Sequence, residues 1–235
     1  MIFRVGVENN NEGRSIAWAL EHPGCFAYGG NASAACVNLE GAIQVYATWI
    51  LKHLHDTWLN FDEVEIIPEE TWEVYFIDDN LDLTSDKDGY SVESFFRHDW
   101  KPLTKDEVEH GLKLLTWSRA DLLKAVSGLN QEKLDATYPL ERWSINGILN
   151  HTAGAEWWYL HRLGRAFPKS EVSDEPLVRL KQTRDALQKV LPALVGVSQV
   201  VGVDGELWSP RKLLRRALWH EIDHIRHIQR LIKEH

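Results

Sequence analysis

Cysteine and methionine are scarce in this chain, and long apolar runs are absent. The 235 residues include two cysteines, Cys25 and Cys36, and one methionine. Two thiols do not make the disulfide framework of a small secreted domain, so we expect reduced, partly buried cysteines; their spacing alone leaves one disulfide open. No apolar run approaches the ~18 residues of a membrane-spanning helix. Residues 1–8 lack the basic and apolar regions of a secretory signal, which indicates a cytoplasmic protein.

Acidic residues are concentrated in the first part of the chain. Residues 1–99 hold 18 Asp and Glu against 5 Lys and Arg, whereas residues 100–235 hold 17 against 21. Such an acidic segment repels a phosphate backbone, so we expect no nucleic-acid partner there. The charge suits either a basic protein partner or ordinary solubilising surface, and the second use is the commoner one.

The first part of the chain changes its hydrophobic period once. Alternating apolar residues predict strands at residues 3–7, 16–20 and 25–28, and a last strand at Trp72–Ile77. Between them, steps of three and four residues predict an amphipathic helix over residues 32–54, which carries the apolar positions Ala35, Leu39, Ile43, Tyr46, Ile50 and Leu54. The order is strand, strand, strand, helix, strand, in an overall α+β chain.

Two short runs carry a resemblance to a known family. Residues 21–29, with Pro23-Gly24-Cys25 at the end of a strand, and the helical run Asn38–Ile43 resemble the HicB-like antitoxin domain. The resemblance implies a small sheet with one packed helix over residues 1–78. Family members often neutralise an RNA-cleaving toxin and commonly carry a separate DNA-binding module, which we do not recognise in this sequence. We therefore take the resemblance first as a statement about fold.

Residues 79–103 have the polar composition of a linker, and residues 104–235 predict a four-helix bundle. The linker carries Phe95, Phe96 and Trp100, which are too apolar for a free tether and are expected to dock. Within the bundle, Thr104 with Glu107 forms a capping box, and Ser144 caps a second helix. A third helix starts at Asp174 and Pro176, and a fourth at Ser209-Pro210. Around Asp204-Gly205, residues 195–208 predict a short hairpin over one bundle end.

Three histidines are the most specific feature of the sequence. His220 and His224 are four residues apart and leave one face of the fourth helix one turn apart. His151 on the second helix can complete a three-nitrogen metal site with a position left for water or substrate. His227 lies near the same stripe as a competing ligand, and four-residue spacing favours His220. A structural zinc would call for a fourth ligand, often Cys, and neither Cys lies in this half.

Several neighbouring residues are candidates to support that site. Ligand histidines need acceptors for their second ring nitrogens, and the candidates are Glu156, Glu221 and Asp223. The candidates to line a pocket are Gly147, Trp158, Trp208, Arg216 and His227. Gly147 and Gly154 on either side of His151 leave room for a ligand or for close approach of another helix, and the second use is the commoner one.

The same histidine runs carry a second resemblance. Residues 143–152 and 218–224 are similar to the DinB-like superfamily of four-helix bundles, also described as DinB/YfiT-like metalloenzymes. The resemblance covers residues 104–234 and places the family's metal site on His151, His220 and His224. It implies zinc or nickel and a homodimer, with a low-molecular-weight thiol as co-substrate in the characterised members. Those members include thiol S-transferases and a thiol-dependent isomerase.

Three functions remain open on sequence alone. The first is a metal-dependent enzyme that acts on a small molecule, by thiol transfer or by hydrolysis, because a bound divalent ion favours both thiolate and hydroxide. The second is a regulatory or binding protein, in which the acidic domain binds a partner and the bundle senses a ligand or metal. The third is a structural bundle with hydrogen-bonded core histidines. Arg215 and Arg216 lie one helical turn before His220. One of them can bind a substrate carboxylate, although a solvated surface charge is the commoner role.

Overall fold

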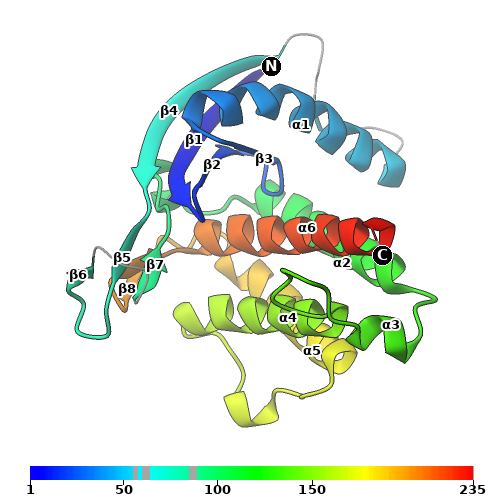
Figure 1. Cartoon of the computed structure of the whole chain (residues 1–235). Helices are drawn as coiled ribbons and strands as arrows, with labels where there is room; N and C mark the ends of the chain where they lie inside the picture. Colours follow the sequence, from blue (N-terminus) through cyan, green and yellow to red (C-terminus); the bar gives the residue numbers. More distant parts are fainter. Residues whose placement is uncertain (55–57, 60–63, 85–88, 235) are drawn as a thin grey trace. The chain divides into compact units, whose positions relative to one another are not determined.

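The computed structural model describes residues 1–54, 58–59, 64–84 and 89–234, and these form two compact units (Figure 1). The N-terminal unit is made of Met1–Lys101 together with Val200–Lys212. The C-terminal unit is made of Pro102–Gln199 together with Leu213–His235. The α+β class is confirmed, since a sheet with one helix precedes a helical region.

The N-terminal unit is built on a four-stranded sheet and one long helix. Its strands lie in the order β3-β2-β1-β4; β1 is antiparallel to β2, β2 is antiparallel to β3, and β1 is parallel to β4. The elements are β1 (Ile2–Asn11), β2 (Arg14–Ala19), β3 (Phe26–Gly29), α1 (Ala32–His53) and β4 (Glu65–Glu73). This is the predicted order of strand, strand, strand, helix, strand.

Helix α1 buries the apolar stripe that its period predicts. Asn31 caps its start, since the Asn31 side chain accepts a hydrogen bond from the Ala34 amide at 2.9 Å. Five of the six predicted apolar positions are buried: Ala35, Leu39, Ile43, Tyr46 and Ile50. The stripe faces β3 and β2, against which the helix packs (Figure 1).

The last strand of the sheet lies earlier in the chain than we predicted. The prediction placed it at Trp72–Ile77, whereas β4 ends at Glu73 and β5 (Tyr75–Ile77) belongs to a second sheet. That sheet has the order β6-β5-β7, with β6 (Leu83–Thr84) and β7 (Tyr90–Val92). Pro68 within β4 hid the strand from pattern analysis, and it is tolerated because β4 is an edge strand.

Residues 79–101 of the expected linker belong to the N-terminal unit. Besides β6 and β7 they contain the 3₁₀ helix η1 (Arg97–Trp100). Phe95 and Phe96 are buried, and a Cβ on Gly6 would lie 2.7 Å from the Phe96 ring. On the same face of β1, the buried Glu8 carboxylate accepts hydrogen bonds from the Ser94 amide and hydroxyl. This segment therefore covers one face of the sheet.

A short hairpin forms where the sequence predicts one, but it belongs to the N-terminal unit. It pairs β8 (Val201–Val203) with β9 (Glu206–Trp208). Asp204 and Gly205 have φ of 50° and 76°, and two consecutive left-handed residues are what a two-residue hairpin turn requires. We had expected the hairpin over an end of the bundle.

Four long helices of the described residues make up most of the C-terminal unit, as predicted. They are α2 (Lys105–Val126), α4 (Ile145–Arg162), α5 (Pro176–Val190) and α6 (Pro210–Glu234), although α6 begins three residues before that unit resumes at Leu213. The short elements α3 (Gln131–Asp135), η2 (Lys169–Glu171) and η3 (Leu191–Leu194) were not predicted. One core cluster joins all four long helices through Leu122, Leu149, Leu180 and Ile228.

The starts of these helices follow their caps. The Glu107 amide donates to Thr104 Oγ1 at 3.2 Å, and the Thr104 amide donates to the Glu107 carboxylate at 2.7 Å, which confirms the capping box. Ser144 Oγ caps α4. The cap of α5 is Glu175, one residue after the predicted Asp174.

Two general expectations can be compared with the structure. Both Cys25 and Cys36 are free thiols. Among the described helices, none has the length and apolar character needed to span a bilayer.

Candidate metal centre

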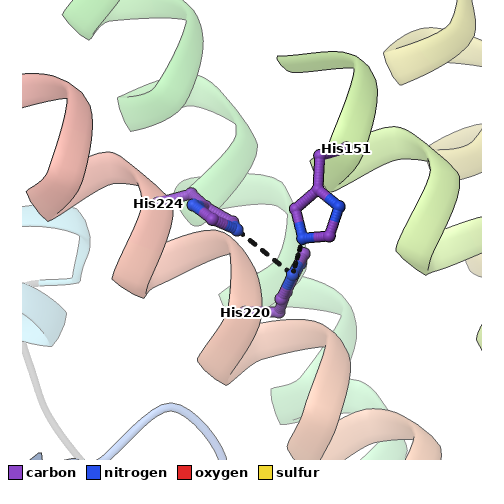
Figure 2. Close-up of side chains that lie close together, drawn as sticks. All are labelled: His151, His220 and His224. Carbon is purple, nitrogen blue, oxygen red and sulfur yellow. Dashed lines mark hydrogen bonds between the residues drawn. The ribbon is translucent and has the colours of Figure 1, made fainter. Parts of the chain in front are cut away.

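Three imidazoles converge inside the C-terminal unit. His220 Nε2 lies 3.0 Å from His151 Nε2 and 3.1 Å from His224 Nε2. The three ligand atoms all lie within 4.8 Å of one another. Figure 2 shows the rings pointing toward one another, two from α6 and one from α4. The four-residue spacing on α6 therefore brings His220 and His224 together as the sequence predicts, and α4 supplies the third ring.

Hydrogen bonding accounts for this arrangement poorly, because His220 Nε2 has one proton or one lone pair to share between two ring nitrogens. The Nε2 atom of a neutral imidazole carries either a proton or a lone pair, so it donates one hydrogen bond or accepts one. His220 Nε2 faces two ring nitrogens and cannot donate to one while it accepts from the other. A cation removes the conflict, because all three nitrogens can direct lone pairs toward it while the protons stay on Nδ1.

Two of the three nitrogen–nitrogen distances are close to those expected around one shared ion. Two imidazole nitrogens bound to one tetrahedral zinc ion are about 3.3 Å apart, given zinc–nitrogen bonds of about 2.0–2.1 Å. The two Nε2 contacts of His220 are within a few tenths of an ångström of that separation. These residues therefore fit a divalent transition metal ion.

Burial keeps the imidazoles in the form that can bind a metal. Burial is the largest cause that lowers the pKa of His220 well below its ordinary value, with further lowering from His224, His151 and Arg216. Burial also lowers the pKa of His224 to about 3, helped by His151 and His227. Neutral rings at pH 7 have free lone pairs, so no proton must leave before a metal binds.

Aromatic rings hold two of the histidines in place. The Trp143 indole stacks on His151, with ring centroids 4.4 Å apart and planes 24° apart. Tyr159 meets His220 edge-on at 6.2 Å. Gly147 makes room for this stack, because a Cβ there would lie 2.9 Å from Trp143 Cβ. The room that we predicted beside His151 is thus filled by Trp143 on this side.

Gly154, which follows His151 on α4, makes no such close contact. Among the described residues, nothing apart from its chain neighbours and its own helix backbone lies within 4 Å of a Cβ built there. Gly154 thus faces open space, whereas Gly147 serves a close contact.

His227 lies outside the group formed by His151, His220 and His224, which we call the histidine trio. Its Nε2 pairs with Glu141 at 2.8 Å, and Arg230 binds the other oxygen of that carboxylate at 2.7 Å. Glu141 precedes Trp143 in the segment before α4, so this contact ties the Trp143 segment to α6. The structure thus favours His220 over His227 as the third member, as the four-residue spacing did.

Two of the three predicted acceptors have different partners from those we expected. Glu156 and Glu221 use their carboxylate oxygens to accept hydrogen bonds from Arg119 and Arg184. A guanidinium offers planar paired donors and a full charge, so it outcompetes a neutral imidazole for a carboxylate. Asp223 is half-buried on α6, and its role as an acceptor stays a prediction.

The remaining pocket candidates fall into different places. Trp158 is half-buried on α4 beneath the Arg162 guanidinium, 4.1 Å from its ring centroid. Arg216 is buried one turn before His220, and its guanidinium lies 4.1 Å from the Trp219 ring. Trp208 belongs to the N-terminal unit, where its indole donates to Glu206 at 2.9 Å. Its role in lining a pocket stays a prediction.

Pattern analysis missed Arg119 on α2 and Arg184 on α5. Both are buried, and both lie among the buried apolar residues of their helices. Arg184 stands between Leu180 and Leu187, four residues after one and three before the other. A charged residue between two apolar residues of one helix face could have indicated a buried charge with a partner of opposite sign.

Comparisons with known proteins concern mainly the helical part of the chain. One solved structure that matches is described as YfiT from Bacillus subtilis, a probable metal-dependent hydrolase with an unusual four-helix bundle topology. It is 18% identical, with a TM-score of 0.46, over 56% of this chain and 89% of that one. No curated protein matches. Residues 114–228 match the DinB superfamily, and this segment carries all three histidines of the trio. The match does not extend to the residues that resemble the HicB-like domain, so that resemblance stays a prediction.

Proposed function

We propose that this protein is a metal-dependent enzyme that acts on a small molecule at the three-histidine centre. The observation that carries the proposal is the convergence of three Nε2 atoms, with His220 Nε2 in close contact with two ring nitrogens and only one proton or lone pair to offer them. The match of residues 114–228 to the DinB superfamily supports it. Zinc and nickel are the metals we propose, because imidazole nitrogen suits both.

The proposed chemistry follows from an incomplete ligand set. Three protein ligands are the usual number in catalytic sites, where the next position takes water or substrate. A divalent ion bound there would lower the pKa of a water or a thiol, which supplies a nucleophile at neutral pH. Hydrolysis and transfer to a low-molecular-weight thiol are therefore both proposed, and they differ in which nucleophile occupies that position.

The residues of the chain have distinct roles in this proposal. His151, His220 and His224 would hold the ion through Nε2. Trp143 fixes the plane of the His151 ring by stacking, and it shields that side of the imidazole from water. The open space at Gly154, three residues along the helix from His151, is where we propose that a substrate approaches.

Metal analysis tests the proposal directly. Purified protein should retain about one equivalent of zinc or nickel after loading and dialysis, and His220→Ala should lose most of it. His161→Ala is the matched control, because His161 is exposed on the same helix as His151 and stacks on Trp157 instead. Wild-type protein that holds less than about a tenth of an equivalent, or a His220→Ala variant that binds as well as wild type, would refute the metal site.

The two reactions are separated by their nucleophile. Loaded protein is assayed with an activated ester, and separately with a small thiol and an electrophile. Turnover of the ester without thiol supports hydrolysis, and turnover that depends on the thiol supports transfer. Each activity should disappear in His220→Ala and persist in His161→Ala.

The acidic first part of the chain favours a second function, that of a regulatory or binding protein. We propose that this part binds a basic protein partner, that the bundle senses a ligand or metal, and that the protein is a homodimer. Several of the acidic side chains already have partners, since Arg4 binds Glu69 and Arg97 binds Glu70. A stoichiometric complex that weakens as salt is raised would support this function, because the proposed attraction is electrostatic. Turnover without any recoverable partner would count against it.

A further inference from the structure

A closed ring of four charged side chains lies in the C-terminal unit. Arg119 donates from Nε to Glu221 at 2.6 Å and from Nη2 to Glu156 at 3.1 Å. Arg184 donates from Nε to Glu156 at 2.7 Å and from Nη2 to Glu221 at 2.7 Å. Each arginine thus bridges both carboxylates, and each carboxylate bridges both arginines. We call these four residues the Arg–Glu ring.

The ring joins the four long helices, because each contributes one member. Arg119 comes from α2, Glu156 from α4, Arg184 from α5 and Glu221 from α6. The side chains are between 1% and 9% exposed, so the charges are almost fully removed from water. Two positive and two negative charges balance within the ring.

Further hydrogen bonds fix the orientation of each member. Arg119 Nη1 donates to the Leu180 carbonyl, and Arg184 Nη1 donates to the Leu115 carbonyl. The Ser118 hydroxyl donates to Glu221, and the Thr183 hydroxyl donates to Glu156 at 2.9 Å. Burial alone would raise the pKa of Glu221, but Arg184 and Arg119 lower it overall. Each member of the ring therefore has several hydrogen-bond partners.

Stability is a weak reason for such a ring. Buried ion pairs lose hydration that their mutual attraction only partly restores, and well-packed apolar residues in their place are often equally stable or more so. What a guanidinium adds is geometry, because its donors are fixed in one plane, and here Nε and Nη2 of each arginine point at two different carboxylates. A ring of such bridges therefore favours one register and one rotation for each helix.

The ring lies directly beside the metal centre. Glu221 follows His220 on α6, and Glu156 lies five residues after His151 on α4. His220 and all four ring members line one small pocket. A slip of α6 by one residue would rotate His220 by about 100° away from His151. The orientation that satisfies Glu221 is therefore tied to the orientation that places His220 in the trio.

We propose that Arg119 and Arg184 are positioning residues that act through Glu156 and Glu221 to hold α4 and α6 in the register that brings the three histidines together. The proposal rests on the metal site proposed above. It predicts that the ring sets metal affinity and coordination geometry without touching the metal, and that this effect can be separated from folding stability.

The experiment uses the full chain with two changes to the ring. Arg184→Lys keeps the positive charge but loses the paired planar donors. The fourfold variant Arg119→Met, Glu156→Leu, Arg184→Met and Glu221→Leu replaces the whole ring with apolar side chains and leaves no unpaired buried charge. Lys181→Met is the matched control on α5, because Lys181 forms an exposed ion pair with Asp185. Cobalt(II) is the probe, with affinity measured by titration and geometry by its visible absorption spectrum.

We expect both ring variants to bind cobalt(II) about ten- to a hundredfold more weakly than wild type, in the range seen when groups behind metal ligands are removed. The cobalt spectrum should shift, whereas thermal unfolding of the metal-free fourfold variant should match or exceed that of wild type. Lys181→Met should leave affinity and spectrum unchanged.

The other outcomes separate the two proposals. If wild type binds no cobalt, the metal site itself fails. If wild type binds and the folded fourfold variant binds equally well with the same spectrum, positioning by the ring is refuted while the metal site stands. If neither ring variant folds, the ring acts in folding rather than in positioning, and this proposal is overturned as well.

Discussion

Replacing Gly147 with alanine tests whether the stack of Trp143 on His151 is as tight as the structure shows. An added Cβ would lie 2.9 Å from Trp143 Cβ and 3.4 Å from two atoms of its ring system. The first of these atoms is close to the backbone and cannot swing aside as the end of a flexible chain can. We therefore expect Trp143 to shift, and with it the ring that stacks on His151.

The magnitude follows from two opposing terms. Inserting a methyl group into a tightly packed place costs about 1–3 kcal/mol of unfolding free energy. Alanine in a helix interior is favoured over glycine by about 1 kcal/mol. The net loss for Gly147→Ala is therefore between about zero and 2 kcal/mol. Gly154→Ala is the matched control on the same helix, where an added Cβ meets nothing within 4 Å, and it should gain up to about 1 kcal/mol.

Urea unfolding of both variants, followed by circular dichroism without metal, measures the difference. Gly147→Ala should be less stable than Gly154→Ala by about 1–3 kcal/mol, or roughly 2–12 °C in melting temperature for a chain of this size. Gly147→Ala should also bind cobalt(II) more weakly than Gly154→Ala. If both variants gain the same stability, the contact between Gly147 and Trp143 is not tight, and our explanation of this glycine is refuted.

Two further predictions concern buried charge and acid. Lys212 is fully buried and pairs with Glu206 at 2.6 Å. Lys212→Met should lower the free energy of unfolding by about 3–5 kcal/mol, because it leaves the Glu206 carboxylate buried without a counter-charge. A loss below about 1 kcal/mol in urea unfolding would contradict this. Folding lowers the pKa of His224 from its ordinary 6.5 to about 3, so between these values the unfolded chain binds more protons than the folded one. The metal-free protein should therefore lose stability as pH falls through this window. His224→Leu should flatten that dependence, and an equal slope in the variant would show that another group is responsible.

Local signals in the sequence predicted much of the fold. The stripe of α1, the capping box at Thr104 and the turn at Asp204-Gly205 all formed where expected. Each depends on residues within a few positions of one another, so tertiary packing had little chance to override them. The α6 half of the histidine trio is of the same kind, because two imidazoles four residues apart must share a helical face.

Contacts between distant segments were harder to predict. The segment around Phe96 has the polar composition of a linker, yet its aromatic ring packs on Gly6, ninety positions earlier. The missing side chain of Gly6 makes the place for that ring, and composition cannot show which distant ring fills it. Likewise, the expected partners of Glu156 and Glu221 were nearby histidines, whereas their actual partners stand on α2 and α5.

The Arg–Glu ring shows which rule would have found those partners. Its two arginines interrupt apolar stripes: Arg119 lies four residues after Leu115 and three before Leu122, and Arg184 is placed in the same way between Leu180 and Leu187. A lone charge at such a position predicts either an exposed helix face or a buried partner of opposite sign. When four helices of one bundle each carry one, with two of each sign, the balanced set can be satisfied within the core. The same argument connects fold to chemistry here, because the two carboxylates of the set stand on the two helices that carry the histidines.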